Sequence, residues 1–559
     1  MIGIFLLWLA FSPVKPVPER HAVSPQVHLQ HKQENSLVPQ KSHPGNSIAE
    51  HIRRHFDRHS HQKGSGITES LPLGSNLARF YSTRSFYPVW TKPLLVSELI
   101  SAVEGALDDG LDPADYHMSQ IREFQSNPPV TPEMQARYDL LLTDAFFTLA
   151  HHLRYGKVNP RSLDPDWNLT ATVSRSALEY KLQNAIATER IALVLKELRP
   201  QYSKYNQLRS ALAKFRAIAR EGGWPTFSPG PSLKEGVRDE RVILLRKRLE
   251  ASGDIAVLKP DTSKVFSREL ADAVKHFQKR NGTEPDGVVG PATVKSMNIP
   301  VERRIDRIRI NLERNRWFLS DVEPTYIMVN IPYFTLHYVE NGRNRWQTRV
   351  IVGQPTRKTP VFKAQMQYIV LNPQWVIPPN ILEKDALPGI RKNLSYLSHK
   401  NLNVLDRNGT LVDPASVNWT QYTSTTLPYR LQQSSGDQGS LGRIKFLLPN
   451  KHIVYLHDTP QKELFKKSSR SFSSGCIRVE NPLELAELVL QDSVKWSMER
   501  IRLAVDAKKT RTVSLPKQIP VFILYLTAVA EGDDILFLDD LYGRDSDVLT
   551  ALNKPVPTF

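Results

Sequence analysis

The hydrophobic periodicity of this chain changes near Pro324, and the change limits the folds that the chain can adopt. Before it, apolar residues such as Leu95, Leu99 and Val103 recur at three- and four-residue spacing, which is typical of amphipathic helices. After it, apolar and polar residues alternate, as in residues 326–330, which is typical of strands. With 559 residues the chain is also longer than one hydrophobic core usually organises. We therefore predict a multidomain α+β protein.

The N-terminal segment carries an export pattern rather than a folded domain. Residues 1–12 begin with MIGIFLLWLAF, an apolar run that is too short to span a bilayer as a helix. We interpret it as a signal peptide or a membrane anchor, although no basic residue precedes it and no A-x-A cleavage pattern follows. Residues 13–66 are rich in Pro, Ser, Gln and His, which predicts a disordered linker.

Two further regions are expected to be helical. Residues 67–236 combine helical spacing with Gly and Pro turn signals, which predicts a helical scaffold domain without chemistry of its own. Residues 301–325 predict a linking amphipathic helix with Ile305, Ile308 and Leu312 on its buried face. Acidic residues alternate with its arginines, so we expect the charged face to be solvated rather than bound to nucleic acid or membrane.

Residues 237–300 predict a module of three short helices. Ser267 is a good N-cap, Asp286-Gly287 makes a turn, and Pro291 opens the third helix. The segments AVKHFQKRNG and PDGVVGPATV resemble the small three-helix peptidoglycan-binding domain, because the Phe-Gln, Asp-Gly and Gly-x-x-Thr elements keep their usual order. The alternative is a generic helical module without the ligand groove.

The net charge of +17 predicts an anionic partner, which could be nucleic acid, a membrane surface or a polymer rich in carboxylates. A nucleic-acid binder would interleave clustered Lys and Arg with aromatic residues along one stripe. The sequence contains no such stripe. We therefore expect no nucleic-acid partner.

The single cysteine, Cys476, rules out an intramolecular disulfide. A lone cysteine commonly packs as a small hydrophobe, so its neighbours decide its role. Residues 451–457, KHIVYLH, alternate as a strand that places Tyr455 and His457 on one face and Asp458 on the other. An imidazole beside a thiol can hold the pair as thiolate and imidazolium. We therefore predict that Cys476 is a nucleophile and that His457 is its base.

The residues around the cysteine suit acyl transfer. Gly475 permits a tight turn, and the amides of Cys476 and of Gly475 or Ser474 are predicted to form an oxyanion hole. Arg478 is predicted to bind a substrate carboxylate through two hydrogen bonds. The catalytic segment has no His/Asp/Glu cluster with ligand spacing, so we expect no metal and no cofactor, and a metal hydrolase is disfavoured.

The segments YLHDTP at 455–460 and SFSSGCIRV at 471–479 resemble the catalytic signature of the L,D-transpeptidase family. That signature runs His, a gap of about fifteen residues, Ser or Thr, His, Gly, Cys, an apolar residue and Asn. Here Ser474 replaces the second His and Arg478 replaces the Asn, which fits the large periplasmic subclass of Gram-negative bacteria. The segments LNPQWVIPPNIL, LGRIKFLLPN and IPVFILYLTAVAEGDD agree with the same subclass.

The resemblance implies a domain order that covers nearly the whole chain after the linker. It implies a mainly-β catalytic domain over residues 326–506 and a lid insertion over residues 380–438 that caps the site. It also implies a C-terminal hairpin and tail over residues 507–559, and we expect this hairpin to complete the sheet.

The resemblance also implies a reaction. Cys476 would attack the carbonyl of the L-centre of diaminopimelate in a stem peptide and expel D-Ala, and a second diaminopimelate amine would take the acyl group in a 3→3 cross-link. His457 would act as base and then as acid, oriented by a carbonyl or hydroxyl near Ser473. Tyr455 and Trp375 are expected to form walls of the donor pocket, with an aromatic core as the alternative.

Peptidoglycan stem peptides are the expected substrates, and wall synthases are the expected protein partners. We expect a periplasmic location, with membrane contact only through an N-terminal anchor. Two alternatives stay open. In an L,D-carboxypeptidase, water would replace the acceptor amine, and in a catalytically silent scaffold the chain would bind wall without remodelling it.

Overall fold

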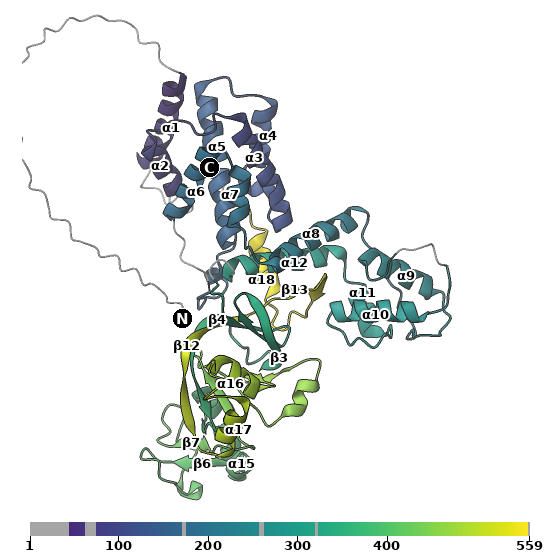
Figure 1. The fold of residues 1–559 in the computed structure, drawn as a ribbon, viewed down its shortest axis with the longest axis vertical. Coiled ribbons are helices and arrows are strands. Elements are labelled where there is room, and N and C mark those ends of the chain that lie inside the picture. The colour runs from purple at the N-terminus through teal and green to yellow at the C-terminus, as the bar shows by residue number, and fades with distance from the viewer. Residues whose placement is uncertain (1–43, 62–73, 170–174, 257–261, 319–321, 557–559) are drawn as a thin grey trace, which may run out of the picture. The chain divides into compact units, whose positions relative to one another are not determined.

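The computed structural model describes residues 44–61, 74–169, 175–256, 262–318 and 322–556 (Figure 1). The signal or anchor expected over residues 1–12 lies outside these ranges, as does most of the expected linker. In the described ranges helices dominate up to Phe318 and a large sheet follows, so the prediction of a multidomain α+β protein is confirmed. None of the helices in these ranges has the length and apolar character that a membrane span requires.

Helix α1 (Pro44–His61) corrects the linker prediction. Ile48, Ile52 and Phe56 recur every four residues, and Ile52 is fully buried in the same hydrophobic cluster as the helices that follow. Polar residues such as Glu50 and Arg54 lie on the exposed side. The polar composition of the whole segment therefore concealed a short amphipathic helix.

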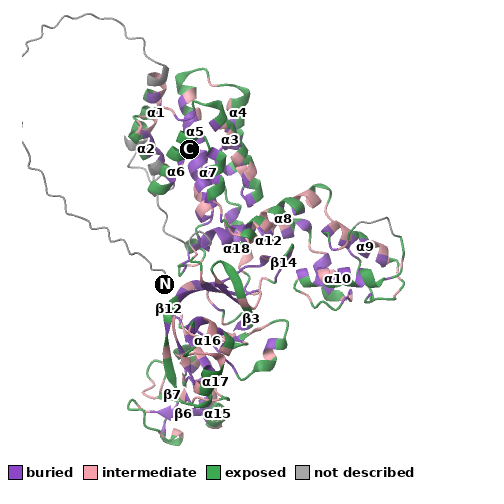
Figure 2. Ribbon diagram, in the orientation of Figure 1, coloured by how far each residue is buried: buried purple, intermediate pink, exposed green. Residues whose placement is uncertain are grey.

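Helix α5 (Pro132–Tyr155) contacts most of the other helices of the first region. Thr131 caps it by accepting a hydrogen bond from the Met134 amide at 3.2 Å, and Pro132 occupies its first turn. Its residues are buried along most of its length (Figure 2). The other elements here are α2 (Gly74–Thr83), α3 (Pro93–Glu104), η1 (Gly105–Asp109), η2 (Pro113–Tyr116), α4 (Met118–Ser126), η3 (Pro160–Ser162), α6 (Arg175–Thr188), α7 (Ile191–Leu198) and α8 (Ser203–Arg220).

Three helices, α9 (Arg241–Ser252), α10 (Arg268–Arg280) and α11 (Pro291–Met297), enclose a separate hydrophobic cluster. The buried side chain of Gln278 joins the parts of this module. It donates to Asp286 Oδ1 at 2.8 Å and to Thr293 Oγ1 at 3.0 Å, and it accepts from the Gly287 amide at 2.8 Å. The Phe-Gln, Asp-Gly and Gly-x-x-Thr elements of the sequence therefore meet at one polar side chain.

Helix α12 (Val301–Phe318) is not the solvated amphipathic helix that its arginines suggested. Glu313 and Arg316 are fully buried, and Arg316 Nη2 donates to Glu313 Oε2 at 2.5 Å. Arg316 Nη1 donates to the Tyr205 hydroxyl and to the Asp109 carbonyl, both at 2.8 Å. Pairing within a buried network, rather than contact with water, satisfies these charges.

The large sheet has nine strands in the order β10-β3-β11-β9-β8-β4-β12-β1-β2, and a further pairing of β3 with β2 closes it into a ring. Helices α16 (Pro482–Leu490) and α17 (Met498–Asp506) pack together, and α16 contacts β12. The strands are β1 (Tyr326–Asn330), β2 (Thr335–Glu340), β3 (Arg343–Gly353), β4 (Phe362–Leu371), β8 (Ile444–Leu447), β9 (Leu456–His457), β10 (Ser471–Ser473), β11 (Ile477–Val479) and β12 (Arg511–Leu524).

The C-terminal region differs from the prediction. Strand β12 inserts between β4 and β1, so the sheet continues beyond residue 506. The hairpin of β13 (Ala528–Glu531) and β14 (Asp534–Phe537) does not complete that sheet but forms a separate two-stranded one. Its buried residues share a hydrophobic cluster with α8 and α12. Helix α18 (Asp545–Leu552) follows.

Residues 380–438, which we call the lid insert, have their own hydrophobic cluster. With β5 (Trp375–Val376), two of its strands form a three-stranded sheet in the order β5-β7-β6. The helices and strands of the segment, β6 and β7 included, are α13 (Pro379–Ile381), the π-helical turn η5 (Leu382–Ala386), α14 (Leu387–Lys392), α15 (Ser395–His399), β6 (Leu402–Leu405), η6 (Pro414–Ser416) and β7 (Arg430–Gln433).

Candidate active site

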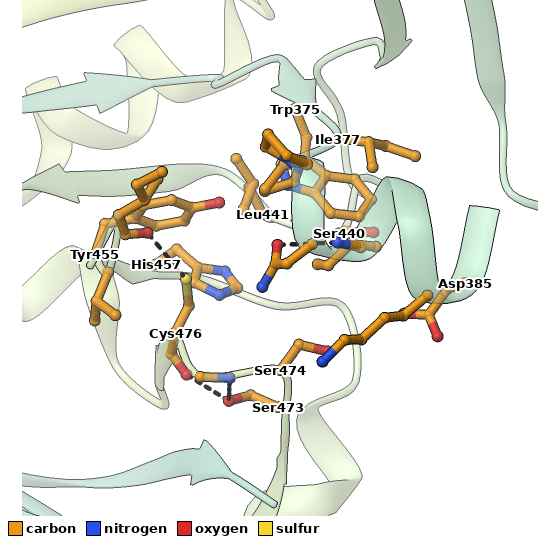
Figure 3. Close-up of a pocket in the computed structure, with 18 of the residues that line it drawn as sticks. Trp375, Ile377, Asp385, Ser440, Leu441, Tyr455, His457, Ser473, Ser474 and Cys476 are labelled. Atoms are coloured by element: carbon orange, nitrogen blue, oxygen red, sulfur yellow. Dashed lines mark hydrogen bonds between the residues drawn. The ribbon is translucent and has the colours of Figure 1, made fainter. Parts of the chain in front are cut away.

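The short strands β9 and β11 present the predicted catalytic pair. They are neighbours and run parallel. Leu456 of β9 and Ile477 of β11 are fully buried in the core, and side chains alternate along a strand. The side chains on either side of them therefore face the opposite way, into a cavity of about 970 Å³ (Figure 3). These cavity-lining residues are Tyr455, His457, Cys476 and Arg478.

The segment before β9 is a turn and not the strand expected over residues 451–457. Ile453 has a φ of +56° and is 62% exposed. The Asn450 side chain holds the turn, accepting from the Val454 amide at 3.1 Å and donating to the Val454 carbonyl at 2.7 Å. The turn places the Ile453 carbonyl 3.8 Å from Cys476 Sγ.

His457 is buried and oriented by the backbone. Its Nδ1 lies 2.5 Å from the carbonyl oxygen of Asp458. A carbonyl only accepts, so Nδ1 carries the proton and Nε2 is left as a base. The Asp458 side chain points elsewhere, as predicted, and accepts from the Arg443 amide at 2.8 Å and from Lys462 at 2.5 Å. The orienting group is therefore next to His457 in sequence, and the expectation that it lies near Ser473 is wrong.

Ser473 instead shapes the turn before Cys476. Its hydroxyl donates to the Cys476 carbonyl at 2.5 Å and accepts from the Gly475 amide at 3.1 Å. Gly475 has a φ of +118°, a conformation that residues with a Cβ rarely adopt. Because the Gly475 amide is engaged, it is not free for the predicted oxyanion hole. The predicted donors that remain are the amides of Ser474 and Cys476.

Burial keeps both members of the catalytic pair neutral. It raises the pKa of the Cys476 thiol. It lowers the pKa of His457 to about 3, and the positive charges of Arg478 and Lys445 act in the same direction. Burial therefore favours the neutral forms of Cys476 and His457 over the predicted thiolate and imidazolium. The hydroxyl and backbone amide of Tyr455 oppose the effect of burial on Cys476, because both donate toward its sulfur and lower its pKa.

Tyr455 and Trp375 both line the cavity, where we predicted them. The Trp375 indole donates to the Tyr455 hydroxyl, and burial raises the pKa of that hydroxyl well above its usual value. The ring of Tyr455 also meets the His457 ring edge-on, with centroids 5.6 Å apart. Tyr455 thus contacts both members of the catalytic pair, whereas Trp375 reaches the site from the segment that leads into the lid insert.

Two cations stand beside this pair. Arg478 lines the cavity and donates to Gln461 Oε1 at 2.6 Å. Lys445 lies opposite His457 across strands β8 and β9, with its Nζ 3.8 Å from the centroid of the Tyr455 ring. Burial lowers the pKa of Lys445. Sequence reasoning missed Lys445, although the segment LGRIKFLLPN was singled out, because only the strand register places it next to His457.

Three family models match separate stretches of the chain. Residues 75–212 match "Scaffold domain", residues 238–297 match "Putative peptidoglycan binding domain", and residues 324–513 match "L,D-transpeptidase catalytic domain". The site described above lies within the last stretch. The chain therefore contains an L,D-transpeptidase catalytic domain, together with a scaffold domain and a peptidoglycan-binding-type domain.

One curated relative, named "Putative L,D-transpeptidase", comes from Haemophilus influenzae and is 38% identical over 225 residues. The match covers 40% of this chain and 45% of the relative, so the chain spans less than half the length of that protein. The L,D-transpeptidase structures from Xylanimonas cellulosilytica and Stackebrandtia nassauensis are 15% and 14% identical, with TM-scores of 0.17 and 0.19. They cover 53% and 54% of this chain, and 100% and 96% of their own lengths. These similarities are too low to bear on the fold or the function.

Proposed function

We propose that this protein is a periplasmic peptidoglycan L,D-transpeptidase that forms 3→3 cross-links between diaminopimelate residues. One observation carries most of the support. His457 keeps an unprotonated Nε2 beside the cavity that holds Cys476, within the stretch that matches the catalytic domain family. The neighbouring match to a peptidoglycan-binding domain supports the same polymer as substrate.

Binding of the donor peptide would activate the neutral pair. Thiolate formation moves the Cys476 proton to His457 Nε2, and the positive charges of Arg478 and Lys445 stabilise the thiolate while they oppose the imidazolium. A donor carboxylate bound to Arg478 would hold the reacting carbonyl beside the thiol. Acyl transfer is then coupled to recognition of an anionic stem peptide.

The reaction would proceed through a thioester. Cys476 Sγ bonds to the carbonyl carbon at the L-centre of diaminopimelate, with the oxyanion held by the amides of Ser474 and Cys476. The bond to D-Ala then breaks, and the His457 imidazolium gives its proton to the departing amine. The side-chain amine of a second diaminopimelate attacks the thioester. It loses a proton to His457, and the proton then returns to the released thiolate.

The lid insert would keep water from the thioester, because water competes with the acceptor amine. Several residues of the insert line the cavity, among them Ile381, Lys384 and Lys400. Shortening the insert is therefore expected to lower the ratio of cross-linked dimer to hydrolysed tripeptide. An unchanged ratio would contradict this role.

The test of the proposal uses the soluble chain and its Cys476→Ala variant, each incubated with a diaminopimelate-containing disaccharide-tetrapeptide. Mass spectrometry is expected to detect dimers that lack one D-Ala, and only with the unaltered chain. Tripeptide without dimer would replace the proposal with an L,D-carboxypeptidase. No turnover and no acyl adduct on Cys476 would indicate a silent wall-binding scaffold.

A further inference from the structure

A loop between β3 and β4, residues 354–359, lies against the residues that precede the nucleophile. We call it the strap loop, and we call residues 473–476 the nucleophile turn. The strap loop makes a hydrogen bond to each of three consecutive residues of that turn. The Gln354 amide donates to the Ser473 carbonyl at 3.0 Å, Arg357 Nη1 donates to Ser474 Oγ at 3.1 Å, and Thr359 Oγ1 donates to the Gly475 carbonyl at 2.8 Å.

The strap loop is itself tightly held. A Cβ on Gly353 would lie 2.2 Å from the Arg357 carbonyl oxygen, so the loop folds back closely over this glycine. The Gly353 amide donates to Thr359 Oγ1 at 2.9 Å. The Tyr542 hydroxyl accepts from the Thr359 amide at 3.1 Å and donates to the Gly353 carbonyl at 2.6 Å. Arg357 therefore projects from a fixed backbone.

The same guanidinium also binds the lid insert. Arg357 Nη1 and Nη2 donate to the two carboxylate oxygens of Asp385 at 2.5 and 2.7 Å. Asp385 belongs to the π-helical turn η5, and both Asp385 and Ser474 line the cavity (Figure 3). A two-point contact fixes orientation as well as distance. One side chain thus joins the lid insert to the residue two positions before Cys476.

We propose that Arg357 is a positioning residue that couples the lid insert to the nucleophile turn. When the insert is in place, Asp385 holds the guanidinium against Ser474, and the turn keeps the shape in which the Ser474 and Cys476 amides face the reacting carbonyl. When the insert moves away, Arg357 loses its carboxylate partner and its hold on the turn weakens. The site would then be fully assembled only when the lid insert also restricts access to it. The role in acyl transfer rests on the proposed function, whereas the restriction of access does not.

Access can be measured without any peptidoglycan substrate, because Cys476 is the only thiol in the chain. The quantity is the ratio of two alkylation rates, that of a fluorescein maleimide over that of iodoacetamide. Asp385→Ala is expected to raise this ratio by about 3- to 10-fold, the range for loss of a partly exposed two-point ion pair. The control is Asp437→Ala, which removes another carboxylate of the lid insert. Asp437 does not line the cavity, and it pairs at 2.5 Å with Arg443, which lies outside the insert. The control is expected to leave the ratio within about twofold of the wild-type value.

A charge swap separates the two contacts of Arg357. In Arg357→Asp/Asp385→Arg the ion pair to the lid insert is restored, but no guanidinium comes from the strap loop to Ser474. In the swap, the alkylation ratio is expected to return toward the wild-type value. Arg357→Ala is expected to lower kcat for dimer formation with little change in KM, and the swap is expected to keep kcat at that lowered value. Arg357→Lys, which keeps the charge, is expected to recover part of both quantities.

The coupling would be overturned by an equal rise of the alkylation ratio in Asp437→Ala, by an unchanged ratio in Asp385→Ala, or by a charge swap that restores kcat fully. Because a variant can also fail to fold, the ionic strength is varied on the wild-type chain. Salt screens exposed ion pairs, so the ratio is expected to rise between about 0.05 and about 0.5 M NaCl in the wild type and to stay flat in Asp385→Ala. A flat wild-type profile would equally overturn the proposal. If dimers never form but these alkylation results hold, the transpeptidase activity fails and the role of Arg357 in access stands.

Discussion

Helix α12 and the candidate catalytic cavity both shield charged groups from water, but they differ in whether those charges have partners. In α12, Arg316 is paired with Glu313, and both are fully buried. Beside the cavity, Lys445 and Arg478 are half-buried and form no ion pair with a carboxylate of the described residues, although Glu463 attracts Arg478 from farther away. A fully buried charge needs a partner inside the fold, whereas a half-buried cation beside a cavity can also pair with an anionic ligand. The contrast separates charges that are paired inside the fold from charges beside the cavity that have no acidic partner in ion-pair contact among the described residues.

The largest effect is expected at the base of the site. His457→Gln removes the proton acceptor from Cys476, so the rate of dimer formation should fall by roughly 10³- to 10⁴-fold. The unfolding midpoint should change little, because the amide can still donate to the Asp458 carbonyl. Initial rates on the disaccharide-tetrapeptide, with circular dichroism melting as the control, measure both. If the variant melted far below the wild type, its low activity would say nothing about a base.

The next largest effect is expected at the Glu313–Arg316 pair in helix α12. Glu313→Gln leaves Arg316 without its buried anion and should lower the free energy of unfolding of the helical region by about 3–5 kcal/mol. Glu302→Gln, at an exposed position of the same helix, is the matched control and should be close to neutral. Urea denaturation followed by circular dichroism distinguishes them. Equal midpoints for the two variants would remove the distinction between α12 and the cavity.

A smaller effect is expected for the cation next to Tyr455. Burial raises the pKa of the Cys476 thiol and Lys445 opposes that rise, so Lys445→Met should move the pH midpoint of iodoacetamide alkylation upward. Lys466→Met, at an exposed position, serves as the control. A midpoint that stays in place, or that moves downward, would show that Lys445 does not stabilise the thiolate.

The last expected effect is on the pH dependence of stability. The folded chain holds His457 with a pKa of about 3, against 6.5 in the unfolded chain, so the unfolded state binds more protons between these values. The stability that His457 contributes is complete above pH 6.5 and is lost as the pH falls toward 3. His457→Gln should therefore flatten part of this acid limb in melting experiments. His276, whose pKa is raised by Asp254, should act with the opposite sign, contributing stability below pH 6.5 that is lost as the pH rises through its folded value.

The sequence was sufficient for the parts of the site that depend on local spacing. Cys476 and His457 were predicted from residues next to them in the chain, and the structure brings both of them to one cavity. Gly475 could be identified because a tight turn requires it. The small module of α9 to α11 followed from capping residues and turn signals that act within a few residues. In each of these cases the determining contact lies close in sequence.

The sequence was insufficient where a partner comes from far along the chain. Strand register alone brings Lys445 to His457. The strap loop is more than a hundred residues from the turn it supports, so neither Arg357 nor its link to Asp385 could be inferred. The buried face of α12 depends on Asp109 and Tyr205, which precede it by about a hundred residues or more. The prediction of the group that orients His457 was wrong for another reason. The direction of a backbone carbonyl at a strand end carries no signal in residue type.

The position of β12 in the sheet has a consequence for biosynthesis. Strand β1 pairs in parallel with β12, and Ile327 lies opposite Val521. The hydrogen bonds between these two strands can therefore form only after Val521 has been synthesised. Helices α2 to α7 contact mainly one another, so they can fold before that partner has been made. The sheet that carries Cys476 cannot close until nearly the whole polypeptide has been made. A chain released by a ribosome that stalls after Cys476 would therefore contain the thiol but lack the strand that completes the sheet around it.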